Sequence, residues 1–227
     1  MVREPDLQAG IRSLQARGYD SSFRPGRASD RTTRRARVIT CPAMDDQVFL
    51  RPVAEDDMPL LYRLTSDPLA TGQHEWFGWR DPGRFRRQWA GNGLLSDDGG
   101  MLIVAAGDQR LGFVSWRKHL IAGTSHCWVI GAAVAPEARG RGTGTEAQRQ
   151  LVRYLFAHTQ VNRIEASTEI TNIGEQRALE RAGFTREGVL RGATFQGGRW
   201  HDAVLYSVLR DDVSPQDLAE IPEREQQ

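Results

Sequence analysis

A glycine-rich segment constrains the fold of this chain more than any other feature. Residues 134–145 read Val-Ala-Pro-Glu-Ala-Arg-Gly-Arg-Gly-Thr-Gly-Thr, which places three alternate glycines and two arginines between a predicted strand and a predicted helix. Glycine lets a backbone approach a bound group closely, a helix N-terminus offers unpaired N–H groups, and arginine adds positive charge. The segment therefore predicts a pyrophosphate-binding loop, with a plain surface loop as the alternative.

The same glycines formally match a dinucleotide-binding motif. Gly142-x-Gly144-x-x-Ala147 has the required spacing, and Glu165 lies at about the distance expected of a residue that holds a ribose. In that fold the strand runs directly into the first glycine, whereas here residues 136–141 intervene. About 80 residues follow the motif, too few to complete a doubly wound sheet. A Walker loop is excluded because no Gly-Lys-Ser/Thr follows.

Composition excludes several functional classes. The 227 residues carry a formal net charge of +1, which predicts one domain of catalytic size and argues against a nucleic-acid partner. Cys41 and Cys127 are far apart and have no neighbours at metal-ligand spacing, so neither a disulfide framework nor a metal site is predicted. There is no run of about 18 apolar residues and no apolar N-terminal stretch. We therefore expect a cytoplasmic protein with no membrane partner.

Three regions differ in composition. Residues 1–46 hold nine arginines and few large apolar residues, so they cannot bury enough surface to offset the entropy of ordering. We interpret them as a disordered extension, or as sequence upstream of a true start at Met44; a basic arm that binds RNA or an acidic partner is the alternative. Residues 47–210 are expected to form the catalytic domain, and the acidic residues 211–227 a frayed tail.

Between these ends, strands and helices alternate. Apolar residues recur at every second position in the predicted strands and at helical spacing in the predicted helices. Three consecutive strands without an intervening helix predict an antiparallel meander. The predicted strands are 48–52, 101–106, 111–118, 125–134, 163–168, 184–190 and 203–209, and the predicted helices are 55–66, 82–89, 145–158 and 173–182.

Three motifs in this central region carry a resemblance to a known family. They are Arg139-x-x-Gly142-x-Gly144, Asn172 with Leu179-Glu180-Arg181-Ala182-Gly183-Phe184, and Glu187-Gly188-Val189-Leu190-Arg191 with Gly198-Arg199-Trp200-His201-Asp202. Together they resemble the GNAT superfamily of acetyltransferases, and in particular its RimJ/RimL-like branch. The resemblance covers about residues 47–210. It implies an α+β fold with a mixed, mostly antiparallel sheet of about seven strands, flanked by helices, and a V-shaped cleft between the fourth and fifth strands.

The resemblance also implies a function. A GNAT enzyme transfers an acetyl group from acetyl-CoA to a primary amine, which here is a protein N-terminus, a small amine metabolite or an antibiotic, and it needs no metal. Val134 would pair with the pantetheine arm of CoA and Asn172 would hold that arm from the other side, although Asn172 also suits a helix cap. Dimers are common in this branch, which suggests a homodimer. The residues expected to bind CoA are Val134, Arg139, Gly140, Arg141, Gly142, Thr143, Gly144, Thr145 and Asn172.

Catalytic residues do not transfer from the resemblance. Attack of an amine on a thioester requires a proton acceptor, stabilisation of the oxyanion and a proton for the leaving thiolate. This chain has Leu179 where many members have a tyrosine, Glu175 where the branch has a serine, and Thr194 where the branch has a carboxylate. Because these groups are missing, a catalytically weak acyl-CoA-binding sensor with the same fold is the alternative function, ahead of a dinucleotide-dependent oxidoreductase.

Two glutamates are our catalytic candidates. Glu175 would lie near the thiol, although its position in the first turn of a helix is equally explained by the helix dipole and solvent. Glu75 falls in an aromatic segment that would line the acceptor side of the cleft, where His74 and Trp76 would bind the amine. A small packed core of tryptophans is the alternative for that segment. His201 and its neighbour Asp202 alternate along a strand, so at most one of them faces the cleft.

Overall fold

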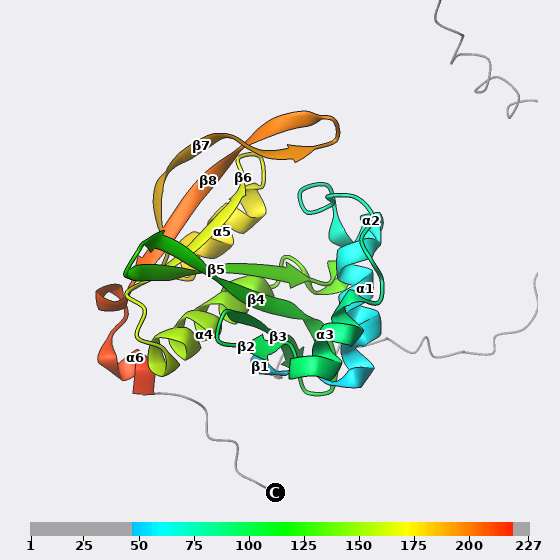
Figure 1. The fold of residues 1–227 in the computed structure, drawn as a ribbon, viewed down its shortest axis with the longest axis horizontal. Coiled ribbons are helices and arrows are strands. Elements are labelled where there is room, and N and C mark those ends of the chain that lie inside the picture. Colours follow the sequence, from blue (N-terminus) through cyan, green and yellow to red (C-terminus); the bar gives the residue numbers. More distant parts are fainter. Residues whose placement is uncertain (1–46, 220–227) are drawn as a thin grey trace, which may run out of the picture. The chain divides into compact units, whose positions relative to one another are not determined.

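The computed structural model describes residues 47–219 (Figure 1). The predictions for residues 1–46, including a start at Met44, and for residues 220–227 lie outside the described part of the chain. One sheet has the strand order β1-β3-β4-β5-β6-β8-β7, and the short strand β2 pairs with β3. The strands are β1 Phe49–Pro52, β2 Leu95–Ser96, β3 Gly99–Ala106, β4 Gln109–Ala122, β5 Ser125–Val134, β6 Arg163–Glu169, β7 Thr185–Gln196 and β8 Arg199–Leu209.

Helices cover both faces of the sheet. They are α1 Met58–Ser66, α2 Pro68–Thr71, α3 Arg84–Asn92, α4 Thr143–His158, α5 Ile173–Arg181 and α6 Pro215–Ala219. Because side chains alternate along a strand, Leu102 and Val104 of β3 pack in one core with α4 and α5, while Ile103 packs in a second core with α1. Trp89 of α3 lies against this second core. Figure 1 shows α1, α2 and α3 gathered beside one end of the sheet.

The mixed, mostly antiparallel sheet confirms the predicted fold class. Every neighbouring pair of strands is antiparallel except β5 and β6. A doubly wound sheet would be parallel, so this topology overturns the dinucleotide-fold alternative. The sheet has eight strands rather than about seven because Leu95–Ser96 adds a two-residue strand.

Several boundaries differ from the prediction for local reasons. The last hairpin extends from Thr185 to Leu209, well beyond the predicted strands, because Gly197 and Gly198 both have positive φ, at 57° and 80°, and close it with a two-residue turn. The helix predicted from Pro82 begins at Arg84, since the Asp81 side chain accepts the Gly83 N–H at 2.9 Å and forms a turn.

Both ends of the domain also depart from the prediction. The helix expected from residue 55 opens as a 3-10 turn, Glu55–Asp57, before α1. The segment expected to fray from residue 211 continues as a 3-10 turn, Arg210–Asp212, and then α6. Arg210 fixes this segment, because its guanidinium donates to the carbonyl oxygens of Phe156 at 2.8 Å and Val161 at 2.9 Å.

The parallel pair β5–β6 is the irregular feature of the sheet. Only two positions pair, Trp128 with Ile164 and Val129 with Glu165. Beyond them β6 follows β8, with which it pairs at seven positions from Arg163 to Glu169. The two strands therefore separate, which confirms the predicted cleft. They correspond to the predicted fourth and fifth strands, and they are labelled β5 and β6 because the short strand β2, which was not predicted, precedes them in the chain.

A buried carboxylate joins the first strand to the first helix. Asp57 has no solvent-exposed surface, and it accepts from both terminal nitrogens of Arg51, at 2.7 and 2.8 Å, and from the Ala54 N–H at 2.8 Å. Arg110 of β4 makes a further ion pair at 2.8 Å. Burial alone would raise the pKa of Asp57, but the bonds from Arg51 and Ala54 outweigh it and hold the pKa below its usual value.

We expect Asp57→Ala to lower the free energy of unfolding by about 3 kcal/mol, because it leaves two arginines and a backbone N–H without their shared acceptor. Urea denaturation at pH 7 measures the change. Since the folded-state pKa is lowered, the contribution of Asp57 is present above its ordinary pKa and is lost as the pH falls through the folded-state value. Glu137→Gln, which removes an exposed ion pair with Arg63, is the control and should have much less effect. Equal losses in the two variants would contradict this account of Asp57.

Candidate active site

A cavity of about 740 Å³ lies where β5 and β6 separate. One wall is formed by residues 71–75, from the end of α2 onward, and another by the end of β5 at residues 132–134. The loop before α4, the first turn of α4 and one side of α5 also line the cavity, together with parts of α1, β4 and the segment 77–84. The cavity thus brings together the glycine-rich loop, Asn172, both candidate glutamates and His74.

The loop before α4 has a backbone conformation that requires glycine at two positions. Gly140 and Gly142 adopt φ values of +74° and +85°, a left-handed conformation that side-chain-bearing residues rarely adopt. Gly142 is the N-cap of α4, a helix of 16 residues, so the first N–H groups of this helix have no partner within it. A Cβ on Gly144 would lie 3.6 Å from the Val134 side chain and would narrow the cavity, which both residues line. This arrangement suits an anion such as a pyrophosphate.

Most of the residues expected to bind CoA line the cavity, but two do not. Arg141 is exposed and Thr143 is buried, and neither forms part of the lining. Thr143 instead stabilises the loop, because its hydroxyl donates to the Ala138 carbonyl oxygen at 3.2 Å. The lining includes Val134, Arg139, Gly140, Gly142, Gly144, Thr145 and Asn172.

Arg139 and Asn172 both have structural contacts in addition to their place on the cavity wall. The guanidinium of Arg139 donates to the Val134 carbonyl oxygen at 2.9 Å and to the Ala70 carbonyl oxygen, and so holds the loop against α2. The Asn172 side chain accepts from the Glu175 N–H at 3.2 Å and caps α5. The helix-capping interpretation of Asn172 is therefore confirmed, and its position on the lining also allows contact with a ligand.

The two candidate glutamates face the cavity from different elements and influence each other. Glu175, in the first turn of α5, is half-buried, and burial is the main cause that raises its pKa to about 7, with the charge of Glu75 adding to it. Gln148 opposes the shift by donating its amide N–H to Glu175 at 2.6 Å. Glu75 keeps contact with solvent through the open side of the cavity, yet the surrounding protein raises its pKa, and nearby His74 offsets part of this rise. Both carboxyls thus hold protons more readily than ordinary glutamates.

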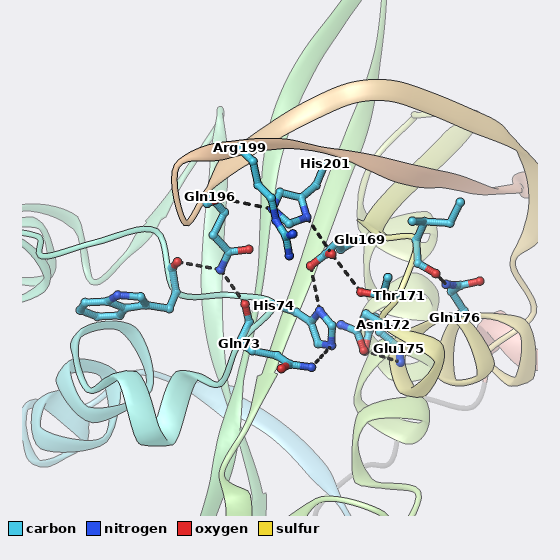
Figure 2. Close-up of polar contacts among 12 residues, drawn as sticks. Gln73, His74, Glu169, Thr171, Asn172, Glu175, Gln176, Gln196, Arg199 and His201 are labelled. Carbon is cyan, nitrogen blue, oxygen red and sulfur yellow. Dashed lines mark hydrogen bonds and ion pairs between the residues drawn. The ribbon is translucent and has the colours of Figure 1, made fainter. Parts of the chain in front are cut away.

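A third carboxylate, Glu169 at the end of β6, joins two histidines. Its oxygens lie 2.8 Å from Nδ1 of His74 and 3.0 Å from Nδ1 of His201. The Thr171 hydroxyl also donates to it at 2.9 Å. The bond from His74 is the largest cause that lowers the pKa of Glu169, so this carboxyl is ionised at neutral pH. Figure 2 shows Glu169 lying between the two imidazole rings.

The β7–β8 hairpin holds the acceptor-side segment 72–79 in place. The amide of Gln196, next to the hairpin turn, donates to the carbonyl oxygens of Gln73 and Trp76, each at 2.7 Å (Figure 2). The Trp76 ring packs edge-on against Trp79, with 5.0 Å between ring centroids, and is not part of the cavity lining. His74 lines the cavity, whereas Trp76 forms a surface pair with Trp79, which is 77% exposed, and neither the predicted amine contact nor the packed tryptophan core describes it.

Sequence reasoning missed Glu169, Gln148 and Gln196. Gln148 had a detectable signal, because it is a polar residue within the apolar face of a predicted helix, next to Ala147. No local pattern marks Glu169 or Gln196.

His201 and Asp202 alternate along β8, as expected. The His201 ring contacts Glu169, while the Asp202 side chain accepts the Gly192 N–H at 2.8 Å.

Other reactive groups do not add to the site. Cys127 is buried, and burial raises its pKa to about 11, so it is not a nucleophilic thiol at neutral pH.

Within residues 47–219, no three His, Cys, Asp or Glu side chains gather as metal ligands. In the same part of the chain, no helix has the length and apolar character needed to cross a bilayer.

Comparisons with known proteins agree with this geometry. Residues 47–185 match the family model of the acetyltransferase (GNAT) domain. The chain is 34% identical over 111 residues to "Probable N-acetyltransferase YjcK" of Bacillus subtilis (strain 168), which covers 49% of this chain and 61% of that protein. It is 27% identical over 98 residues to the ribosomal protein uS5-alanine N-acetyltransferase of Escherichia coli (strain K12), which covers 43% of this chain and 50% of that protein.

A solved structure shows the same fold. The spermidine N-acetyltransferase from Vibrio cholerae in complex with CoA and spermine superimposes with a TM-score of 0.64 and 18% identity, over 73% of this chain and 97% of that one. The chain spans less than two thirds of the length of both curated relatives. The family model, however, matches more than half of the chain. The chain therefore belongs to the GNAT acetyltransferase family, as the sequence motifs indicated.

Proposed function

We propose that this chain is an acyl-CoA-dependent N-acyltransferase that transfers an acetyl group from acetyl-CoA to a primary amine. One observation carries the proposal: the cavity between the separated strands β5 and β6 ends at the glycine N-terminus of α4. A CoA thioester needs both an anion site for its pyrophosphate and an adjoining groove for its long, amide-containing pantetheine arm. The V. cholerae spermidine N-acetyltransferase, which has the same fold, holds CoA.

Acetyl-CoA would lie along the free edge of β5. The pyrophosphate would accept from the unpaired N–H groups at the start of α4, near the positive charges of Arg139 and Arg181, which line the cavity. Beyond Val129, β5 has no strand partner on its β6 side among the described residues, so its backbone on that side is available to the pantetheine amides, apart from the Val134 carbonyl oxygen that accepts from Arg139. An extended arm that pairs with a sheet edge in this way resembles the addition of a strand.

The reaction requires two proton transfers. The amine nitrogen attacks the carbonyl carbon of the thioester and loses a proton, the C–S bond breaks, and the leaving thiolate gains a proton. We assign the second transfer to Glu175, because a carboxyl with a pKa of about 7 is partly protonated at neutral pH. Glu75 on the facing wall would attract the cationic acceptor before it loses its proton.

The acceptor is assigned only to the class of primary amines. The two named N-acetyltransferases of known specificity act on different amines, since one is named for spermidine and the other for an alanine of ribosomal protein uS5. A catalytically weak sensor with the same fold would bind acetyl-CoA without releasing thiol. The paired carboxyls at the reacting end of the cavity favour the enzyme over that alternative.

We expect Gly144→Val to weaken acetyl-CoA binding at least tenfold without unfolding the protein. The added side chain finds ordinary contact distance to Val134, yet it occupies the cavity beside the phosphate site. Isothermal titration calorimetry with acetyl-CoA measures the change. Gly91→Val, on α3 and with open space around a Cβ, is the matched control. Unchanged affinity in Gly144→Val would argue against this placement of CoA.

A second test concerns the proton donor. Glu175→Gln should lower kcat for thiol release by about 100-fold, in the range typical of a lost general acid.

Gln148→Leu removes the hydrogen bond that lowers the Glu175 pKa, so the pKa of Glu175 should rise above about 7. Carboxyl-labelled glutamate NMR measures it, with the resonance assigned by its loss in Glu175→Gln. The exposed variant Glu137→Gln should leave both rate and resonance unchanged; a Glu175 pKa near 4.5 would refute the assignment.

A further inference from the structure

We propose that His74 is the general base that takes the proton from the attacking amine, and that Glu169 is its positioning residue. The proposal rests on the proposed N-acyltransferase function and assigns the proton transfer that Glu175 does not perform. His74 lines the acceptor side of the cavity, on the segment that follows α2. It is the one imidazole among the described residues that forms part of this lining.

The contacts of His74 select one tautomer. The ionised Glu169 accepts at Nδ1, at 2.8 Å, so this nitrogen carries the hydrogen. The Gln73 amide nitrogen lies 3.1 Å from Nε2 and donates to it, so Nε2 presents its lone pair. Gln73 is exposed and also lines the cavity, so an amine can take its place at Nε2. A carboxylate that orients an imidazole from behind and leaves the other nitrogen as base is an established catalytic arrangement.

Glu169 is itself firmly held. His201 and Thr171 bind its second oxygen, and the other ring nitrogen of His201 lies 3.1 Å from the Gln196 carbonyl oxygen. Gln196 in turn binds the acceptor-side segment through its side chain. The end of β6, the β7–β8 hairpin and the segment of His74 are therefore linked around one carboxylate (Figure 2).

Three charged or titratable groups lie around His74. Glu169 on β6 is ionised and bonds to Nδ1 of His74, Glu75 follows His74 on the same segment and has a raised pKa, and Arg199 contacts His201 at 3.3 Å. The Glu75 carboxyl has no hydrogen-bond partner among the described residues, so it is less well oriented than His74 to receive a proton. Its role is then electrostatic, toward the cationic amine.

The complete step balances. The cationic acceptor first releases one proton to water. The lone pair of the neutral amine then forms the N–C bond to the thioester carbonyl carbon, an N–H proton passes to Nε2 of His74, the C–S bond breaks, and the thiolate takes the proton of Glu175. The products are an amide and a free thiol, with His74 protonated and Glu175 ionised. Water at the open cavity returns the proton from His74 to Glu175, so no other reactant is needed.

The test uses the full chain with acetyl-CoA and a panel of peptides with free N-termini and polyamines, and follows thiol release against pH. His74→Asn should lower kcat by about 10²- to 10⁴-fold and leave the Kd for acetyl-CoA unchanged. In His74→Ala, added imidazole should restore part of the rate. Glu169→Gln should lower kcat while leaving both the KM for the amine and the Kd for acetyl-CoA unchanged, because the imidazole loses the acceptor that fixes its tautomer. His119→Asn, exposed on β4, is the matched control.

The outcomes separate this proposal from the proposed function. If the wild-type protein binds acetyl-CoA but releases no thiol with any amine, the transferase function itself fails, and the base assignment falls with it. If the wild-type protein is active while His74→Asn and Glu169→Gln each keep kcat within about threefold, only the base assignment is overturned. Failure of imidazole to restore any rate in a folded His74→Ala protein would also overturn it.

Discussion

The site depends on the loss of pairing between β5 and β6. Two positions pair, after which β6 is held to β8 and turns away, so the backbone of β5 loses its neighbour inside the sheet. Backbone N–H and C=O groups buried without partners are costly, and an open cavity of about 740 Å³ keeps them accessible to water or a ligand. The same separation brings the N-termini of α4 and α5 to one gap, where the positive ends of the two helix dipoles favour negative charge.

Charge within the gap is divided according to the surroundings of each carboxyl. Glu169 receives hydrogen bonds from His74, Thr171 and His201, which keep its pKa low. Glu175 has one donor, Gln148, and burial prevails over it. One carboxyl is therefore suited to hold an imidazole and the other to release a proton, although both are glutamates.

Local chemistry made part of this structure predictable, and long-range contacts made the rest unpredictable. The glycine loop before α4 and the cap at Asn172 follow from residue type and neighbouring sequence; the loop between strand and helix was predicted, and the cap was one of the two interpretations of Asn172. The bond between His74 and Glu169 joins residues 95 positions apart, so only the sheet order brings them together. The packing of Trp76 on Trp79 was similarly undecidable, because an aromatic loop suits a ligand wall and a small core equally well.

The position of Gln148 connects the proposed phosphate site to the proposed proton donor. Gln148 is buried in α4, the helix whose N-terminus would hold the pyrophosphate, and its amide N–H donates to Glu175 of α5. A helix rises about 1.5 Å per residue, so Gln148 lies about 9 Å along the axis from the Gly142 cap, on the same rigid element. The other amide atom of Gln148, Oε1, has no hydrogen-bond partner in the described structure. An amide can donate to an ionised carboxylate or, after rotation, accept from a protonated one. Gln148 therefore serves both protonation states of Glu175, which explains why a buried polar side chain is tolerated between two packed helices.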